Sequence, residues 1–138
     1  MIFDSFGDVN WLAILVATVA WFAFSAIWYS IPPLSQAWQR ASRVDMNTEG
    51  TSLAMLFIPT FIGYFVTTVV IALLVSATGT TGLGDGIALG VAIGVGFGAV
   101  GALVNQLYEQ KGANYWLING LNAVIAYSIV AAIHAVWD

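Results

Sequence analysis

Charged residues are scarce in this chain. Asp, Glu, Lys and Arg make up 7% of its 138 residues, against roughly 25% in ordinary soluble domains. Hydrophobic residues make up 60%, and the mean hydropathy is +0.90. So few charges cannot cover the surface of a water-soluble domain, and so apolar a chain does not stay disordered in water. The composition therefore excludes a soluble globular protein and predicts a membrane protein.

Cysteine is absent, histidine and basic residues are few, and each shortage excludes a function. The chain has no cysteine, which excludes disulfides, thiolate nucleophiles and cysteine metal sites. Three Lys and Arg residues and a net charge of −4 argue against nucleic-acid binding, which needs clustered cations. One histidine cannot build a zinc site. No Ser/His/Asp arrangement, carboxylate pair or phosphate-binding loop is present, so we expect no enzyme, no catalytic residue, no metal and no cofactor.

Four charge-free apolar stretches are each long enough to cross a hydrocarbon core as a helix, which takes about 20 residues. They cover residues 9–31, 53–76, 87–108 and 115–137. None alternates strictly between apolar and polar residues, and a helix satisfies its backbone hydrogen bonds internally in lipid, so helices are favoured over strands. We predict an all-α integral membrane protein, with four transmembrane helices in one compact bundle and residues 1–138 as a single domain.

The few cations predict how the chain is oriented. Arg40 and Arg43 lie between the first two spans, and Lys111 lies between the last two, whereas the opposite side carries only acids. By the positive-inside bias, both cation-bearing connections face the cytoplasm, and both chain ends lie on the other side of the cytoplasmic (inner) membrane. The first span has no basic region before it and no small-residue cleavage site after it, so we expect it to be retained rather than removed as a signal peptide.

The connection after the first span has a helical pattern of its own. After Pro32 and Pro33, which stop the first helix, Leu34, Trp38 and Ala41 recur at helical spacing. The pattern predicts a short interfacial helix over residues 34–44 on the inner leaflet. An irregular loop anchored by one tryptophan is the alternative. Between the second and third spans, residues 77–86 are rich in Gly and Thr and predict a flexible turn.

Small residues recur every four positions in the third span and line one face of the helix: Gly86, Gly90, Gly94, Gly98 and Ala102. Such a glycine-zipper face lets another helix backbone approach closely. Gly96 and Gly101 are expected to widen the same groove. The partner of this face stays open at this point: another span of this chain, a second copy, or a different protein.

Four amide side chains lie within the third and fourth spans. Asn105 and Gln106 lie near the inner end of the third, and Asn119 and Asn122, spaced i and i+3, lie at a similar depth in the fourth. Helices joined by a short connection are antiparallel neighbours, so the two pairs are expected to hydrogen-bond across the interface as a polar clamp. A solute or ion site is the alternative interpretation.

The single histidine, His134, lies close to the outer end of the fourth span. The plainest interpretation is a histidine near water at the membrane interface. Asp4 and Asp8 start the first span on the same side, and imidazole titrates near neutrality, so a proton-sensing pair is a second interpretation. Axial ligation of a haem or a chlorophyll-type pigment is a third.

Several short motifs resemble one family of membrane proteins. They are Asn10-Trp11, Trp28-Tyr29 shortly before Pro32, Trp38, Asp85-Gly86 at the start of the glycine-rich span, Leu107-Tyr108-Glu109, Asn119, and Ala132-Ile133 with Trp137. The chain is similar, over nearly its whole length, to the small bacterial membrane proteins of domain of unknown function 1761. The resemblance implies a four-helix membrane fold and brings no catalytic residues. His134 departs from the aliphatic residue expected at that position.

The charged residues all lie outside the predicted spans, so the embedded carboxylate of a proton-driven exporter is missing and proton antiport is disfavoured. We expect a non-enzymatic accessory or scaffold subunit of a membrane assembly. Its expected partners are the lipid bilayer and either further copies of this chain or another membrane protein. The alternative is a small oligomeric channel or facilitator for a small solute, with a path lined by Asn105, Asn119, Asn122 and the glycines. A pigment- or haem-binding subunit that uses His134 is a third class.

Overall fold

A computed structural model describes residues 2–42 and 53–137, and every regular element in these two ranges is helical. In chain order the elements are the 3₁₀ helix η1 (Ile2–Asp8), α1 (Trp11–Ser30), α2 (Pro32–Ser42), α3 (Leu53–Ala77), α4 (Leu83–Ile93), the π-helical segment η2 (Gly94–Ala99), α5 (Val100–Glu109) and α6 (Ala113–Trp137). α4, η2 and α5 follow one another without a break and form one helix, Leu83–Glu109, which we call the third span.

The predicted four-helix membrane fold is confirmed. Within the described ranges, four helices are long and apolar enough to cross a membrane: Trp11–Ser30, Met55–Ala77, Leu83–Glu109 and Ala113–Trp137. The third span begins at residue 83 rather than 87, so Asp85 lies in the first turn of a helix and not in the preceding loop. A carboxylate is favoured there by the partial positive charge of the helix N-terminus. The chain is a multi-pass membrane protein.

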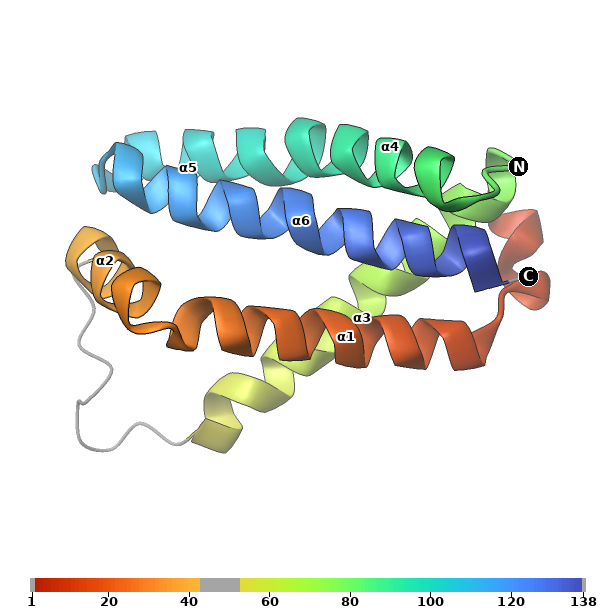
Figure 1. The fold of residues 1–138 in the computed structure, drawn as a ribbon, viewed down its shortest axis with the longest axis horizontal. Coiled ribbons are helices and arrows are strands. Elements are labelled where there is room, and N and C mark those ends of the chain that lie inside the picture. Colours follow the sequence, from red (N-terminus) through yellow and green to blue (C-terminus); the bar gives the residue numbers. More distant parts are fainter. Residues whose placement is uncertain (1, 43–52, 138) are drawn as a thin grey trace.

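The connections alternate between the two ends of the bundle. η1 and the end of α6 lie at one end, which we call the terminal end, together with the turn between α3 and α4 (Figure 1). The opposite end, where α2 and the turn between α5 and α6 lie, is called the α2 end. Which side of the membrane each end faces stays a prediction from the loop charges. Arg43 and Asp138, on which that prediction partly depends, lie outside the described residues.

Two prolines determine the boundary between α1 and α2. Ile31 has an extended backbone, with φ −61° and ψ 122°, because the ring of a following proline disfavours the helical region. Pro32 and Pro33 then form the first turn of α2, where a missing N–H leaves no hydrogen bond unmade. The predicted helix over 34–44 therefore begins earlier, at residue 32, and its last two positions lie outside the described residues. α2 packs against both α1 and α6.

The turn between α3 and α4 is shorter than predicted and is tied to α6. Gly79 and Gly82 have φ values of +65° and +87°, a region that residues with a Cβ rarely adopt. The backbone N–H of Gly82 donates to the carbonyl oxygen of Ala135 at 3.1 Å. This hydrogen bond holds the start of the third span against the end of α6.

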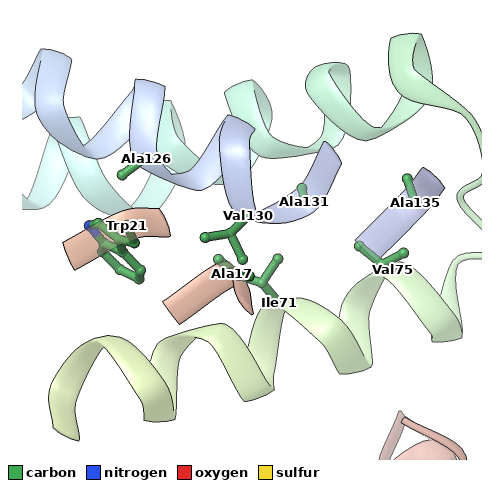
Figure 2. Packing of buried hydrophobic residues seen from close by; sticks show 8 residues of the cluster. All are labelled: Ala17, Trp21, Ile71, Val75, Ala126, Val130, Ala131 and Ala135. Atoms are coloured by element: carbon green, nitrogen blue, oxygen red, sulfur yellow. The ribbon is translucent and has the colours of Figure 1, made fainter. Parts of the chain in front are cut away.

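α6 is the central helix of the bundle. It packs against α1, α2, α3 and the third span, whereas the third span makes its main contacts with α6 alone. The buried core lies where α6 meets α1 and α3, and it consists of Ala17, Trp21, Ile71, Val75, Ala126, Val130, Ala131 and Ala135 (Figure 2). Half of these residues are alanines, which let helix backbones approach closely in a solvent that supplies little hydrophobic force between helices.

The glycines of the third span pack against the backbone of α6. A Cβ atom on Gly90 would lie 2.4 Å from the Cα of Ser128, and one on Gly94 would lie 2.7 Å from the Cα of Val124. Real Cβ atoms essentially never come this close to another heavy atom, so a side chain at either position requires the two helices to separate. Similarly short distances occur at two more positions of the same face, Gly86 and Gly98. Ala102, further along, is half-buried.

Two neighbouring glycines do not belong to this packed face. A Cβ atom on Gly96 or Gly101 would have nothing within 4 Å. The expectation that they widen the groove is therefore wrong. They lie at other angles around the helix, because Gly96 is two residues, or about 200°, from Gly94 and from Gly98, and Gly101 is one residue, or about 100°, from Ala102.

The π-helical segment was not predicted from the sequence. In it the N–H of Val100 donates to the carbonyl of Val95, five residues earlier. Residues four apart drift by about 40° per step around a regular α-helix, and the wider π turn reverses part of that drift. The segment therefore keeps Gly98 directed at α6, where its Cβ position is 2.7 Å from the Cβ of Ala123.

Replacing Gly90 with alanine should lower the free energy of unfolding by about 2 kcal/mol, because the new methyl group meets backbone that cannot move without separating two helices. Gly63→Ala is the matched control, since Gly63 lies inside α3 with nothing within 4 Å of its Cβ position. Alanine is the better helix former, so the control should be as stable as the wild type or more so. Unfolding in mixed detergent micelles measures both, and equal stabilities would contradict the packing argument.

Candidate functional site

The asparagines of α6 are bonded to α1. The hydroxyl of Tyr29 donates to the Oδ1 of Asn119 at 2.6 Å, and the Nδ2 of Asn122 donates to the Oγ of Ser25 at 3.3 Å. Ser25 and Tyr29 are spaced i and i+4, and Asn119 and Asn122 are spaced i and i+3, so each pair lies on one helix face. Two hydrogen bonds therefore join the central helix to the first span within the membrane.

The predicted clamp between the third and fourth spans is wrong. Asn105 is exposed, whereas Gln106 is buried and uses its Oε1 to accept from the N–H of Gly112 at 3.0 Å. The backbone carbonyl of Gln106 also accepts from the N–H of Lys111 at 3.2 Å. Gln106 thus closes the turn between α5 and α6. The amides of the two spans do not meet because α6 turns its small-residue face to the glycines, which directs its asparagines toward α1.

A cleft lies beside the bond between Tyr29 and Asn119. On the way to the α2 end, α3 diverges from α1 (Figure 1), and the space between α1, α2, α3 and α6 has a volume of about 450 Å³. Small-molecule sites have volumes in this range. We call it the α1/α3 cleft. Its polar lining residues are Ser25, Tyr29, Ser30, Thr60, Tyr64, Tyr115 and Asn119.

Sequence reasoning found only one of these polar residues, Asn119. Tyr29 and Tyr115 fit the pattern of aromatic residues at a membrane interface, which hides any other role. The signal that was available is the i and i+4 spacing of Ser25 and Tyr29, two polar side chains on one face of a largely apolar span. Polar groups inside a membrane are expensive unless they are paired or functional.

A smaller cavity lies at the terminal end. Its volume is about 200 Å³, and both His134 and Asp8 line it, together with Asn10, Thr80 and other residues of the nearby turn. Asp4, the other acid considered for a pair with the histidine, is not in the lining. His134 is buried, with 8% of its surface exposed, and it faces this cavity; its role stays a prediction. The turn of residues 78–82 is hydrogen-bonded to the end of α6 and contributes Gly79, Thr80 and Thr81 to the cavity lining.

Metal binding has no support in the described part of the chain. Among residues 2–42 and 53–137, no three His, Asp or Glu side chains lie close enough to hold an ion. The α1/α3 cleft is lined by hydroxyl, amide and aromatic groups and carries no Asp, Glu, His, Lys or Arg in its lining. Its chemistry is that of hydrogen bonding to uncharged groups.

Removing the bond between α1 and α6 should weaken the fold. Tyr29→Phe and Asn119→Leu should each lower the free energy of unfolding by about 1 kcal/mol, the scale of hydrogen bonds between membrane helices. Their effects should not add in the double variant, because both remove the same bond. Asn105→Leu is the control and should leave stability unchanged. Unfolding in mixed micelles measures all four, and additive losses from Tyr29→Phe and Asn119→Leu would refute the pairing.

A family model matches most of the chain. The family model described as Protein of unknown function (DUF1761) matches residues 12–135. The chain matches no curated protein and no solved structure. The matched range runs from the second residue of α1 to the last turn of α6 and contains nearly all of the four spans. The resemblance seen in the sequence is confirmed, and the chain belongs to the DUF1761 family.

Proposed function

We propose that this chain is a non-enzymatic subunit of an assembly in the cytoplasmic membrane, and that it docks a helix of another membrane protein on the open face of its third span. The observation that carries the proposal is a second stripe of small residues on that span. Its members recur every four positions and are all exposed: Gly84, Ala88, Ala92 and Gly96.

This second stripe lies on the helix face opposite the packed stripe, by which we mean the glycines that meet α6: Gly86, Gly90, Gly94 and Gly98. Each of its members is two residues away from a member of the packed stripe, for example Ala88 from Gly86 and from Gly90. Two residues turn an α-helix by about 200°. One face of the third span is thus closed against α6, and the opposite face has the same small-residue spacing with none of the described helices packed against it.

No contact within the described chain requires glycine at the two glycine positions of the open face. A Cβ atom on Gly84 or Gly96 would have nothing within 4 Å, yet glycine inside a helix costs about 1 kcal/mol relative to alanine. The third span is also the least covered: 11% of the residues in its most apolar stretch are buried, against 28% to 33% in the other spans. A partner helix that approaches closely explains both features.

The channel alternative has less support. It needs Asn105, Asn119, Asn122 and the glycines along one path. Asn105 is exposed, the other two asparagines are bonded to α1, and the packed glycine stripe is closed by the backbone of α6. These groups lie on different faces of the chain, so the geometry favours a docking subunit.

A cross-linking experiment tests the docking face. The chain has no cysteine, so Ala92→Cys carries a single thiol to which a photoreactive reagent can be attached in native membranes. We expect a cross-link to one foreign membrane protein. Ala23→Cys is the control, since Ala23 is an exposed alanine of α1, and it should not give this product.

The composition of the extracted particle completes the test. Native mass spectrometry after mild detergent extraction should show a stoichiometric foreign protein with the wild type and with Ala23→Leu, and its loss with Ala92→Leu. A homo-oligomer that is lost with Ala92→Leu would favour the channel alternative. A bare monomer from all three would contradict docking.

A further inference from the structure

The α1/α3 cleft has a lining whose chemistry selects a ligand. We propose that it binds an uncharged, membrane-soluble compound with a flat ring and carbonyl oxygens, of the quinone class. This proposal is independent of the docking function, because it concerns the opposite side of α6 and different residues. Three properties of the lining carry it: aromatic walls, unused hydrogen-bond donors and the absence of charge.

Aromatic rings are a large part of the walls. Half of the lining residues are aromatic: Phe22, Tyr29, Trp38, Phe57, Tyr64 and Tyr115. The rings of Phe22 and Phe57 meet edge to face with centroids 5.6 Å apart, and Phe22 and Tyr64 do so at 6.3 Å. Such walls offer ring faces and edges to a flat aromatic or quinoid ring, for which offset and edge contacts are favourable. A saturated acyl chain does not require them.

Most of the polar lining residues of the cleft carry a hydrogen-bond donor that no described residue accepts, but three of them use their donors within the protein. The hydroxyls of Ser30 and Thr60 donate to backbone carbonyls of their own helices, and the hydroxyl of Tyr29 donates to Asn119. Within the described residues, the amide nitrogen of Asn119 and the hydroxyl of Tyr64 donate no hydrogen bond to the protein.

Two further hydroxyls of the lining also lack an acceptor among the described residues. Ser25 accepts from Asn122 and donates to no other described residue, and the hydroxyl of Tyr115 also has no acceptor in the described chain. Hydroxyl and amide hydrogens without acceptors match a ligand that brings acceptor oxygens. A carbonyl group is the uncharged form of such an acceptor.

The lining excludes a charged head group. Of the twelve lining residues that the structure describes, none is Asp, Glu, His, Lys or Arg, and an ion brought among them would lose its water without gaining a counter-charge. Two of the three cations of the chain, Arg40 and Lys111, line a separate space of about 490 Å³ at the α2 end. A phospholipid phosphate therefore finds its partners there and not in the α1/α3 cleft.

The cleft is large enough for a ring and too small for a long tail. A volume of about 450 Å³ accommodates a substituted ring, and a hydrocarbon tail must extend into the bilayer through the side where α3 diverges. The lining residues come from α1, α2, α3 and α6, so binding of a ring depends on the position of α3.

Decylubiquinone is the probe for this site, because it is an uncharged ring with carbonyl oxygens and a short tail. Titrated into the purified full chain in detergent and followed by tryptophan fluorescence quenching, it should bind saturably at one molecule per chain, with Trp38 in the cleft wall reporting. Decylbenzene, which has the ring and tail but no carbonyl, should fail to displace it. Phosphatidylglycerol should also fail to displace it.

Two exposed alanines of α1 provide a matched pair of variants. Ala26 lines the cleft and Ala23 does not. Ala26→Phe fills the space and should weaken decylubiquinone binding at least tenfold, whereas Ala23→Phe should bind like the wild type. Asn119→Leu, which removes a donor, should weaken binding roughly tenfold, the effect of losing one hydrogen bond to the ligand.

The proposal is overturned if Ala26→Phe binds decylubiquinone as tightly as Ala23→Phe, or if decylbenzene competes equally well. Displacement by phosphatidylglycerol would show a lipid site instead. Because Ala26→Phe changes an exposed position, its test stands even where Asn119→Leu fails to fold. Loss of quinone binding with Ala26→Phe together with an unchanged foreign partner would show that ligand site and docking face are separate.

Discussion

The contact between the third span and α6 is the constraint on which the remaining structure depends. At Gly90 the two helix backbones are so close that a single Cβ atom would lie 2.4 Å from the Cα of Ser128. In a membrane, where burial of apolar side chains supplies little force between helices, such close backbone packing is a main source of association. The direct consequence is that α6 has one face committed to the third span, and its rotation about its own axis is determined.

The rotation of α6 about its axis determines which residues of α1 and α3 its other side meets. Its asparagines point to α1, where Tyr29 and Ser25 meet them, and its small core residues meet α1 and α3. α3 stays close to the core at Ile71 and Val75 and then diverges toward the α2 end (Figures 1 and 2). The space that this divergence leaves is lined with the polar groups of α1 and α6, so the polar bond and the cleft share one cause.

The contact between the third span and α6 also determines which residues of the third span lie on the outside of the bundle. The third span contacts α6 and leaves its opposite face with small residues exposed, and the π-helical segment keeps the packed stripe in phase over the length of the span. Our two proposals therefore rest on separate features of the chain. One is a helix face with exposed small residues, and the other is an open cleft lined by uncharged groups.

How much of this follows from the sequence depends on the physical origin of each feature. The four spans, the all-helical fold and the family are readable from the chain, because hydrocarbon thickness and the cost of buried charge act on composition and length alone. Asn119 is also recognisable as a polar residue in a span. Its partner is not, because an amide pairs equally well with Gln106 or with Tyr29, and only the rotation of α6 chooses between them.

The sequence by itself therefore determined which segments cross the membrane and that the third has a small-residue stripe against which a backbone can pack. Only the tertiary structure decided that α6 fills that stripe, that a second stripe stays open, and that His134 is buried in a cavity with Asp8. Periodicity along a chain defines the faces of a helix, whereas the choice of neighbour for each face is made by packing between segments distant in sequence. The α1/α3 cleft is of this second kind, because it exists only where α3 leaves the bundle that the other helices form.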